Sequence, residues 1–179
     1  NLDMNDTGTL TSTAATIDTV TLAGNAVTTA VVVTGENGVT LTNTDNVAIG
    51  ENAGDALTSG NSNVAIGMQA LTADTLGDRA VAIGLDALAS QNFTTTTDNY
   101  NVAVGHSTGK SVTTGVQNTL VGGLAGDAIT GSSYNTAVGY SALGATSNTG
   151  ERNVGVGHSA LGSVTSGGSN TAVGLGALK

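Results

Sequence analysis

The five-residue phrase Asn46-Val47-Ala48-Ile49-Gly50 is the first of eight similar copies in this chain. The copies end on glycines that follow one another at steps of 17, 17, 21, 17, 17, 18 and 17 residues, namely Gly50, Gly67, Gly84, Gly105, Gly122, Gly139, Gly157 and Gly174. A short and nearly fixed period is typical of a chain that stacks one small unit on itself. The sequence therefore predicts a repeat architecture over residues 46–179.

The phrase itself has the pattern of a short strand. Its second position is Val or Thr throughout, and its fourth position is always Ile or Val. Residues two apart share one face of a strand, so one face of each strand is aliphatic. The third position is Ala in six copies, with Leu120 and Gly155 as the exceptions, and this small face allows close approach of a neighbour. We expect the fourth positions to stack into a buried core column: Ile49, Ile66, Ile83, Val104, Val121, Val138, Val156 and Val173.

A second segment follows each phrase and begins with Ala in seven of the eight units. Leu comes next in five units, whereas the other three have Gly there and an aliphatic residue three positions later. We interpret this segment as a second strand that supplies the opposite wall of the coil, closed by polar turns. Two short strands and two turns in 17 residues describe one coil of a parallel β-solenoid. Eight coils at a strand separation of roughly 4.8 Å would make a rod about 40 Å long.

The first position of the phrase is Asn in seven units and Ala80 in the remaining one. Stacked Asn side chains can hydrogen-bond from coil to coil while they hold a tight turn. We therefore predict a structural Asn ladder rather than a ligand site, made of Asn46, Asn63, Asn101, Asn118, Asn135, Asn153 and Asn170.

The composition narrows the classes of function. The chain of 179 residues has a formal net charge of -9 and only four Lys and Arg residues, which are not clustered, so we expect no nucleic-acid partner. It has no cysteine, so it has neither a disulfide nor a thiolate site. Its longest apolar runs, such as residues 30–33, are too short to span a bilayer, so we expect no membrane insertion of this segment.

Residues 1–45 lie outside the repeat and form a separate N-terminal lead-in segment in our interpretation. The Thr- and Val-rich stretches at 16–22, 30–33 and 38–42 predict strands, and the Gly-Glu-Asn-Gly sequence at 35–38 predicts a turn. Residues 46–179 form the eight-unit solenoid, whose last coil is incomplete at Lys179. Either the natural chain continues beyond this residue or the next subunit completes the coil.

The repeats resemble those of a known family. Asn135-Thr136-Ala137-Val138-Gly139-Tyr140-Ser141-Ala142-Leu143 and Asn153-Val154-Gly155-Val156-Gly157-His158-Ser159-Ala160-Leu161 are similar to the repeats of YadA-like heads in trimeric autotransporter adhesins, and to phrases in phage tail fibres. The unit here is longer than that of the adhesin heads. The resemblance covers residues 46–179. It implies a left-handed parallel β-roll, a homotrimer of three chains side by side, and attachment to a surface.

No constellation of residues predicts catalysis, a cofactor or a metal site. His106 and His158 occupy the same position of the repeat, but three coils separate them, and we interpret them as surface or interface residues. The only four-residue insertion lies in 90–100, and solenoid insertions project as loops that often bind ligands. Phe93 and Tyr100 in this candidate contact loop could stack on a sugar or contact a partner. A tolerated insertion whose aromatic residues cover the coil edge is the simpler alternative.

The leading functional hypothesis is a non-enzymatic, adhesive segment of a homotrimeric extracellular fibre. The location would be a virion tail fibre or a bacterial cell surface, and the partner a host glycan or protein receptor. The alternative is a filament subunit that stacks end to end, because an uncovered strand edge is a template for further pairing. A polysaccharide-cleaving spike is a third class, but the chain has no evident pair of facing carboxylates of the kind that glycoside hydrolysis needs.

Overall fold

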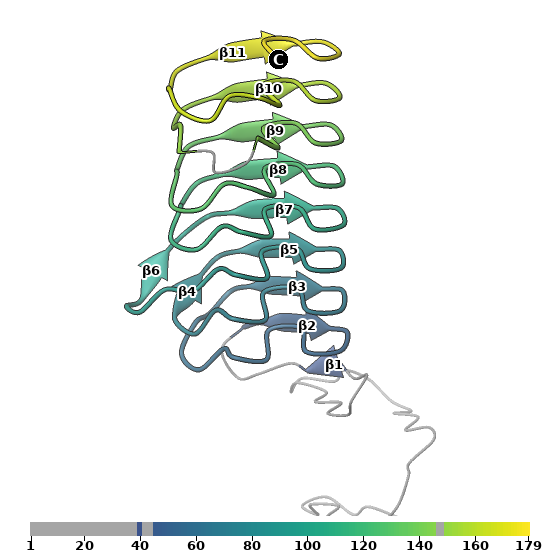
Figure 1. Ribbon diagram of the computed structural model, residues 1–179. Coiled ribbons are helices and arrows are strands. Elements are labelled where there is room, and N and C mark those ends of the chain that lie inside the picture. The colour runs from purple at the N-terminus through teal and green to yellow at the C-terminus, as the bar shows by residue number, and fades with distance from the viewer. Residues whose placement is uncertain (1–38, 41–44, 146–148) are drawn as a thin grey trace, which may run out of the picture.

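The computed structural model describes residues 39–40, 45–145 and 149–179, and these form an all-β parallel solenoid of about seven turns with coils of about 17 residues. Figure 1 shows the coils stacked into a rod. The strands are β1 (Val39–Thr40), β2 (Val47–Ile49), β3 (Val64–Ile66), β4 (Gly77–Asp78), β5 (Val81–Ile83), β6 (Thr97–Asp98), β7 (Val102–Val104), β8 (Thr119–Val121), β9 (Thr136–Val138), β10 (Val154–Val156) and β11 (Thr171–Val173). Each copy of the phrase thus supplies one strand.

The strands of the eight phrases form one parallel sheet in the order β2-β3-β5-β7-β8-β9-β10-β11. Their register is strict, since each phrase position pairs with the same position in the next coil, as in Ile49 with Ile66 and Ile66 with Ile83. Strand β1 pairs antiparallel with β2 and so extends the sheet at one end. Strands β4 and β6 form a separate two-stranded parallel pair at the side of the rod (Figure 1).

The prediction that the fourth-position residues form a buried core column is wrong. The middle residue of each of the eight phrase strands is buried. Where it is an alanine or Leu120, its exposed fraction is 5% or less. The residues on either side of it are partly or largely exposed. Ile49 is 39% exposed, and Val138 and Val173 also lie among the exposed large hydrophobic residues. The fourth-position residues do stack in register, but on the outer face of the sheet. The small alanines are inside because the interior of so short a coil has little room beside this strand.

The bulk of the core comes from the second segment of each coil. Leu71, Leu88, Leu143 and Leu161 are fully buried, and in the coils with Gly at this position the later aliphatic residue takes their place, as Val112 and Ile129 do. The predicted second strand is absent from the described residues, where this segment is a series of turns. Leu88 has a φ of 50°, a left-handed conformation that is costly for a bulky side chain. Gly109 meets the same requirement without that cost, with a φ of 58°.

The glycine that ends each phrase is held against its counterpart in the next coil. Gly84 has a φ of +132°, and a Cβ atom there would lie 2.3 Å from the carbonyl oxygen of Gly105. No residue with a Cβ atom fits between backbones that approach so closely. The recurrent glycine therefore reflects the stacking distance of the coils as well as the turn.

The predicted lead-in segment, residues 1–45, falls largely outside the residues that the structure describes. The strands predicted at 16–22 and 30–33 lie outside the described residues. From the strand predicted at 38–42, Val39–Thr40 form β1. The described part of the solenoid begins at Asp45.

Candidate interaction surfaces

The outer face of the main sheet is a candidate interaction surface. It consists of two parallel columns, which we call the aliphatic face. One column holds the second positions of the phrases, Val47, Val64, Val81, Val102, Thr119, Thr136, Val154 and Thr171, and the other holds the eight fourth positions from Ile49 to Val173. None of these sixteen side chains carries a charge. An uncharged and largely aliphatic surface of this extent is typical of an interaction site.

The aliphatic face also changes along the rod. Its first four coils carry Val at the second position, and its first three carry Ile at the fourth. Later coils have Thr at three of four second positions and Val at every fourth position. The end of the face near β2 is therefore bulkier and more apolar than the end near β11.

The Asn side chains line up as a ladder of hydrogen bonds inside the coils. The backbone N–H of Asn118 donates to the Oδ1 of Asn101 at 2.9 Å, and the backbone N–H of Asn135 donates to the Oδ1 of Asn118 at 3.0 Å. The Nδ2 of Asn118 donates to the carbonyl oxygen of Ser132 at 3.0 Å and so closes the turn of its own coil. Equivalent coil-to-coil bonds reach from Asn46 to Asn63 and from Asn135 through Asn153 to Asn170.

The gap in the ladder at Ala80 is filled from the insertion. The N–H of Ala80 donates to the Oδ1 of Asn63 at 2.8 Å, but Ala80 has no amide to offer the next coil. Asn99, which is fully buried, takes over: its Oδ1 accepts the backbone N–H of Asn101 at 2.9 Å. The ladder thus continues through the longest unit of the chain, and Asn99 was not a predicted member of it.

Replacement of one rung tests the structural role of this ladder. Asn118→Ala removes the acceptor of the Asn135 N–H and the donor to the Ser132 carbonyl, in a fully buried setting. We expect a loss of roughly 2–3 kcal/mol of unfolding free energy, since a buried N–H left without its acceptor costs about 1–3 kcal/mol and a lost hydrogen bond about 1 kcal/mol. Denaturant unfolding followed by circular dichroism measures it. An Asn170→Ala control, in a partly buried rung, should cost less, and equal losses would contradict the ladder interpretation.

The insertion is anchored by a buried carboxylate. Asp74 is fully buried and accepts hydrogen bonds from the Nε2 of Gln91 at 2.6 Å, the N–H of Gly77 at 3.1 Å and the N–H of Phe93 at 3.2 Å. The Oε1 of Gln91 in turn accepts the Nδ2 of Asn101 at 2.8 Å. A buried charge is tolerated when it is saturated with hydrogen bonds in this way. The network pins the start of the insertion to the coil.

The two aromatic residues of the predicted contact loop have different environments. Phe93 is 5% exposed and packs inward, so its prediction as a contact residue is wrong. It is inward because the N–H of Phe93 is held by Asp74, which draws this part of the loop onto the coil. Tyr100 is 49% exposed, and the guanidinium carbon of Arg79 lies 5.8 Å from its ring centroid. Arg79 also pairs with Asp98, whose carboxylate lies 3.5 Å from the Tyr100 hydroxyl.

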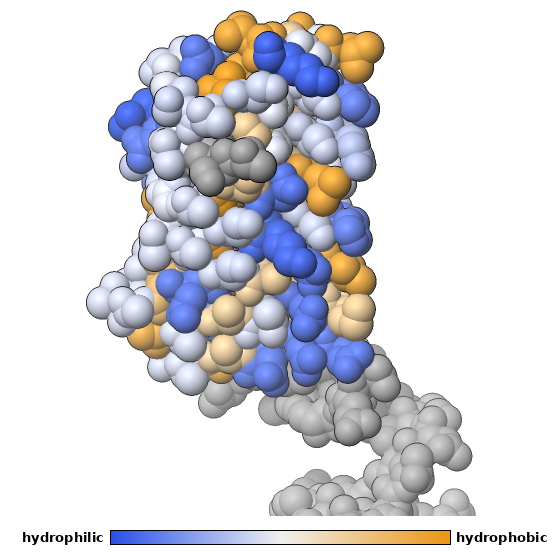
Figure 2. Space-filling model, in the orientation of Figure 1, coloured by the Kyte–Doolittle hydropathy of each residue, from blue (hydrophilic) through white to orange (hydrophobic). Residues whose placement is uncertain are grey.

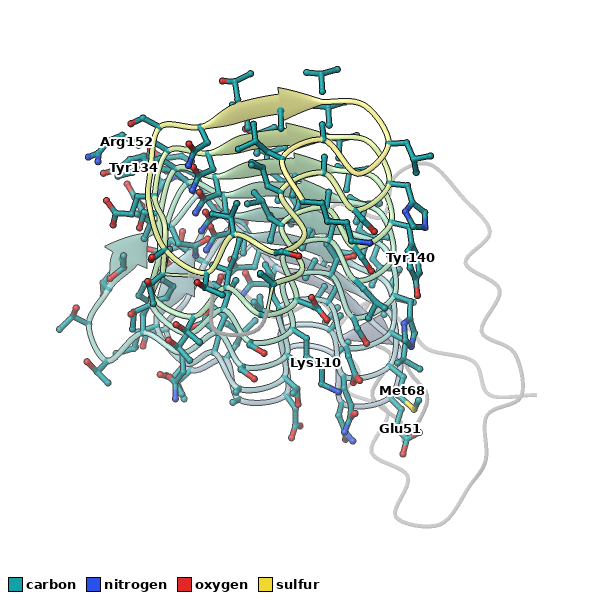
Figure 3. The ribbon with its side chains drawn as sticks, turned by 45° about the horizontal axis from the view of Figure 1, so that its top comes forward. Glu51, Met68, Lys110, Tyr134, Tyr140 and Arg152 are labelled. Atoms are coloured by element: carbon teal, nitrogen blue, oxygen red, sulfur yellow. The ribbon has the colours of Figure 1, made fainter. Side chains whose placement is uncertain are left out.

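A second tyrosine has the same surroundings further along the rod. Tyr134 is 44% exposed, and the guanidinium carbon of Arg152 lies 5.2 Å from its ring centroid. Arg152 pairs with Glu151 at 3.3 Å. Figure 3 shows Tyr134 and Arg152 together at one edge of the solenoid, with Tyr140, Met68 and Glu51 along the opposite edge.

The opposite edge carries the two histidines. His106 and His158 are exposed, and His158 stacks on Tyr140 with ring centroids 5.3 Å apart. Among residues 39–40, 45–145 and 149–179 there is no group of three or more His, Cys, Asp or Glu residues placed to hold a metal ion. The side chains that face the viewer in Figure 2 are mainly of intermediate hydropathy, with a hydrophilic band and hydrophobic residues along one edge.

One acidic residue in the described part of the chain has a clearly displaced pKa. Partial burial raises the pKa of Asp127 above its ordinary value of 3.8, against the opposing effect of hydrogen bonds from the backbone N–H groups of Asp127 and Ala128. The folded state therefore holds this proton more tightly than the unfolded state. Stability contributed by protonated Asp127 is present at low pH and is lost as pH rises through the folded pKa.

The linkage predicts a small effect of Asp127→Asn. At pH 7 the variant removes an ionised carboxylate that folding partly desolvates. Because much of this side chain remains in solvent, which screens its charge, we expect the unfolding free energy to equal or exceed that of the parent by about 0.5 kcal/mol or less. Below pH 3.8, where the carboxyl is protonated in both states, the difference should vanish. Thermal unfolding at pH 3 and pH 7 measures it, with Asp55→Asn in the equivalent turn as the control. A gain at pH 3 alone would contradict the assignment.

Comparisons with family models, with curated proteins and with solved structures find no match to this chain. No helix in the described part of the chain could cross a membrane.

Proposed function

We propose that this chain is a non-enzymatic segment of an extracellular adhesive fibre, in which three copies lie side by side around a common axis. The observation that carries the proposal is the aliphatic face. Sixteen uncharged side chains stand in two straight columns on the outside of the sheet, where they contribute nothing to the core of their own coil. Surface of this kind is stabilised when another chain covers it.

The geometry of the face favours copies of the same chain as its cover. Each coil presents the same two positions at the same height, so three faces around a threefold axis would meet level by level along the rod. A closed threefold ring buries the same surface of every copy and leaves none exposed. The left-handed β-roll, the trimer and the attachment role are those that the resemblance to adhesin heads and phage tail fibres implies.

End-to-end stacking is the competing arrangement. It requires the open edge of β11 to pair with the edge of β2 in the next copy. Strand β1 already pairs with β2 through Val39 with Ile49 and Thr40 with Ala48. Stacking would have to displace this strand, and it would leave the aliphatic face exposed along the whole filament. Side-by-side assembly therefore explains more of the structure.

Mass measurement tests the proposal. Analytical ultracentrifugation of the chain over a wide concentration range is expected to give a discrete species of three times the 17.3 kDa chain mass. The labelled trimer is then incubated with intact bacterial cells and with bare beads, and selective retention on cells is expected. A monomer at all concentrations, a dimer or open-ended polymers would contradict the assembly. A trimer that no cell surface retains would contradict the adhesive role alone.

A further inference from the structure

Two columns of side chains flank the aliphatic face, one on each side of the main sheet. The leading column holds the residue just before each phrase, and the trailing column holds the residue just after its glycine, six positions later. In the coils of β5, β7, β8, β9 and β10 the leading column consists of Arg79, Tyr100, Gln117, Tyr134 and Arg152, and the trailing column of Leu85, His106, Gly123, Tyr140 and His158. None of these ten residues is buried.

The two columns gather residue types that the rest of the chain lacks. All three tyrosines, both histidines and both arginines of the chain stand in them. The tyrosines are between 44% and 53% exposed and give nothing to the hydrophobic core, which alanines and leucines mainly fill. Tyr and Arg at a surface are typical of the residues that dominate binding between proteins. The columns therefore have the composition of a protein–protein contact.

Ring contacts hold the leading column in place. Arg79 pairs with Asp98, and its guanidinium carbon lies 5.8 Å from the ring centroid of Tyr100. The guanidinium carbon of Arg152 lies 5.2 Å from the ring centroid of Tyr134. Side chains that are ordered before a partner arrives lose less conformational entropy on binding.

The trailing column is ordered by stacking. The rings of Tyr140 and His158 lie 5.3 Å apart, and Nδ1 of His158 lies 3.0 Å from the Ser159 hydroxyl oxygen. A Cβ atom at Gly123 would lie 3.5 Å from Cδ2 of Tyr140, so this ring extends over the preceding coil. Figure 3 shows Tyr140 at one edge of the solenoid and Tyr134 with Arg152 at the other.

The width of the aliphatic face lets neighbouring copies in the proposed trimer meet at their edges. Two sheets packed face to face lie about 10 Å apart, so each face of the trimer would stand about 5 Å from the axis. A triangle with that distance from centre to side has sides of about 17 Å. The six steps from a leading residue to its trailing residue span at most about 20 Å at the rise of a strand. Both edges of each face therefore reach the corners of the triangle.

Threefold symmetry determines which edges meet. Rotation about an axis along the rod repeats the strand direction around the triangle, so the start of the strands in one copy lies beside their end in the next. A pure rotation adds no shift along the rod, so each leading residue meets the trailing residue of the same coil. Aromatic side chains stand on both edges of the same two coils, with Tyr100 and His106 in the coil of β7, and Tyr134 and Tyr140 in that of β9.

We propose that the leading column of one copy contacts the trailing column of the next at each corner of the trimer. Tyr134 packs against Tyr140 of the next copy, and Tyr100 packs against His106 of the next copy. The inference rests on the proposed side-by-side trimer and assigns the residues that join its copies beyond the aliphatic face.

Disulfide mapping tests this contact, and the chain suits it because it has no cysteine. The Tyr134→Cys, Tyr140→Cys double variant places one thiol in each column at the level of β9. Oxidation is expected to give a covalently closed trimer on a denaturing gel, since each copy is joined to both neighbours. A short bis-maleimide serves for thiols whose Cα atoms lie beyond the roughly 7 Å that a disulfide spans. The Tyr100→Cys, His106→Cys double variant should give the same product at the level of β7.

Two controls have the same chemistry in the wrong place. Tyr134→Cys alone and Tyr140→Cys alone put three equal thiols at three different corners, so no cross-link within the trimer is expected. The Tyr100→Cys, Tyr140→Cys double variant has its thiols two coils apart, or roughly 10 Å along the rod, and should form a closed trimer with neither reagent.

The affinity of the copies provides a second readout. Tyr134→Ala and Tyr140→Ala are each expected to raise the concentration at which the trimer dissociates at least about tenfold. The double variant should raise it by less than the product of the two effects, because both changes remove the same contact. Tyr100→Ala combined with Tyr140→Ala, on different levels, should give the full product. Sedimentation equilibrium measures these concentrations.

The outcomes separate failure of this contact from failure of the proposed assembly. Discrete trimers that give no closed product from either level-matched double variant would overturn the corner contact and leave the trimer intact. Equal product from the Tyr100→Cys, Tyr140→Cys control would also overturn the contact. Monomers, dimers or open-ended polymers of the parent chain would refute the proposed assembly and the contact together.

Discussion

Ile83→Lys is expected to convert the proposed trimer into folded monomers. Ile83 lies in the third of the eight strands of the aliphatic face, paired with Ile66 and Val104 on the neighbouring strands, and its side chain points away from the core of its coil. In the proposed trimer three ammonium groups would be buried close to the axis, where unpaired charges cost several kcal/mol. We expect trimer dissociation at concentrations at least about 1,000-fold higher than for the parent, equivalent to roughly 8 kcal/mol for the trimer because its dissociation constant varies with the square of that concentration.

Sedimentation equilibrium measures the shift, and circular dichroism reports whether the coils remain folded. Thr114→Lys introduces the same charge at an exposed turn residue away from the sheet and should leave the trimer unchanged. A variant that sediments as the parent does would refute side-by-side assembly through this face. A variant that unfolds would instead show that Ile83 supports its own coil, contrary to its position on the outer face.

Gly84→Ala is expected to destabilise the solenoid by roughly 3–5 kcal/mol, since a left-handed backbone strained by a side chain costs about 1–3 kcal/mol and overpacking a similar amount. The added methyl carbon would lie 2.3 Å from the carbonyl oxygen and 2.6 Å from the carbonyl carbon of Gly105. Both contacts are backbone atoms, so relief requires the two coils to separate. That separation breaks hydrogen bonds such as the one from the Gly105 N–H to the Ile83 carbonyl, at 2.8 Å.

Gly174→Ala isolates the steric part of this effect. Gly174 has a φ of +126°, similar to the +132° of Gly84, but nothing in the described residues lies within 4 Å of a Cβ atom there. The control should lose only the conformational term, about 1–3 kcal/mol. Guanidinium unfolding at one fixed protein concentration compares the two, because assembly contributes to apparent stability. Equal losses would show that coil contact does not explain the recurrent glycine.

Most of the architecture follows from pattern alone. The 17-residue spacing of the phrase Asn-x-Ala-Ile/Val-Gly predicts stacked parallel strands, and the structure pairs every copy in register with the next. Periodicity is informative here because one small unit cannot bury its apolar residues unless it is stacked. The prediction of an all-β solenoid with coils of this length is confirmed.

The candidate interaction surfaces could be predicted from the sequence only in part. The insertion drew attention to Phe93 and Tyr100 because loops are common binding sites, yet Asp74 draws Phe93 inward. Comparison of equivalent positions in the repeat identified the Asn ladder. Applied to the position one residue earlier, the same comparison would have placed Tyr100 and Tyr134 on one edge of the solenoid. It would not have shown that Arg79 lies over Tyr100 and Arg152 over Tyr134, since the path of a long side chain depends on its neighbours in space.

The amino-acid sequence alone determines the repeat unit, the position of each strand and the register of the strands, because these depend on the period and on local chain geometry. The sequence pattern does not determine which side of each strand faces the core. Alternation in Val47-Ala48-Ile49 creates an aliphatic face and a small one, and either could line a core. The turns determine which face points inward, because their left-handed residues direct leucines such as Leu71 and Leu88 into the core of the coil. Those leucines leave space for alanine alone on the facing strand, so Val and Ile are placed outside.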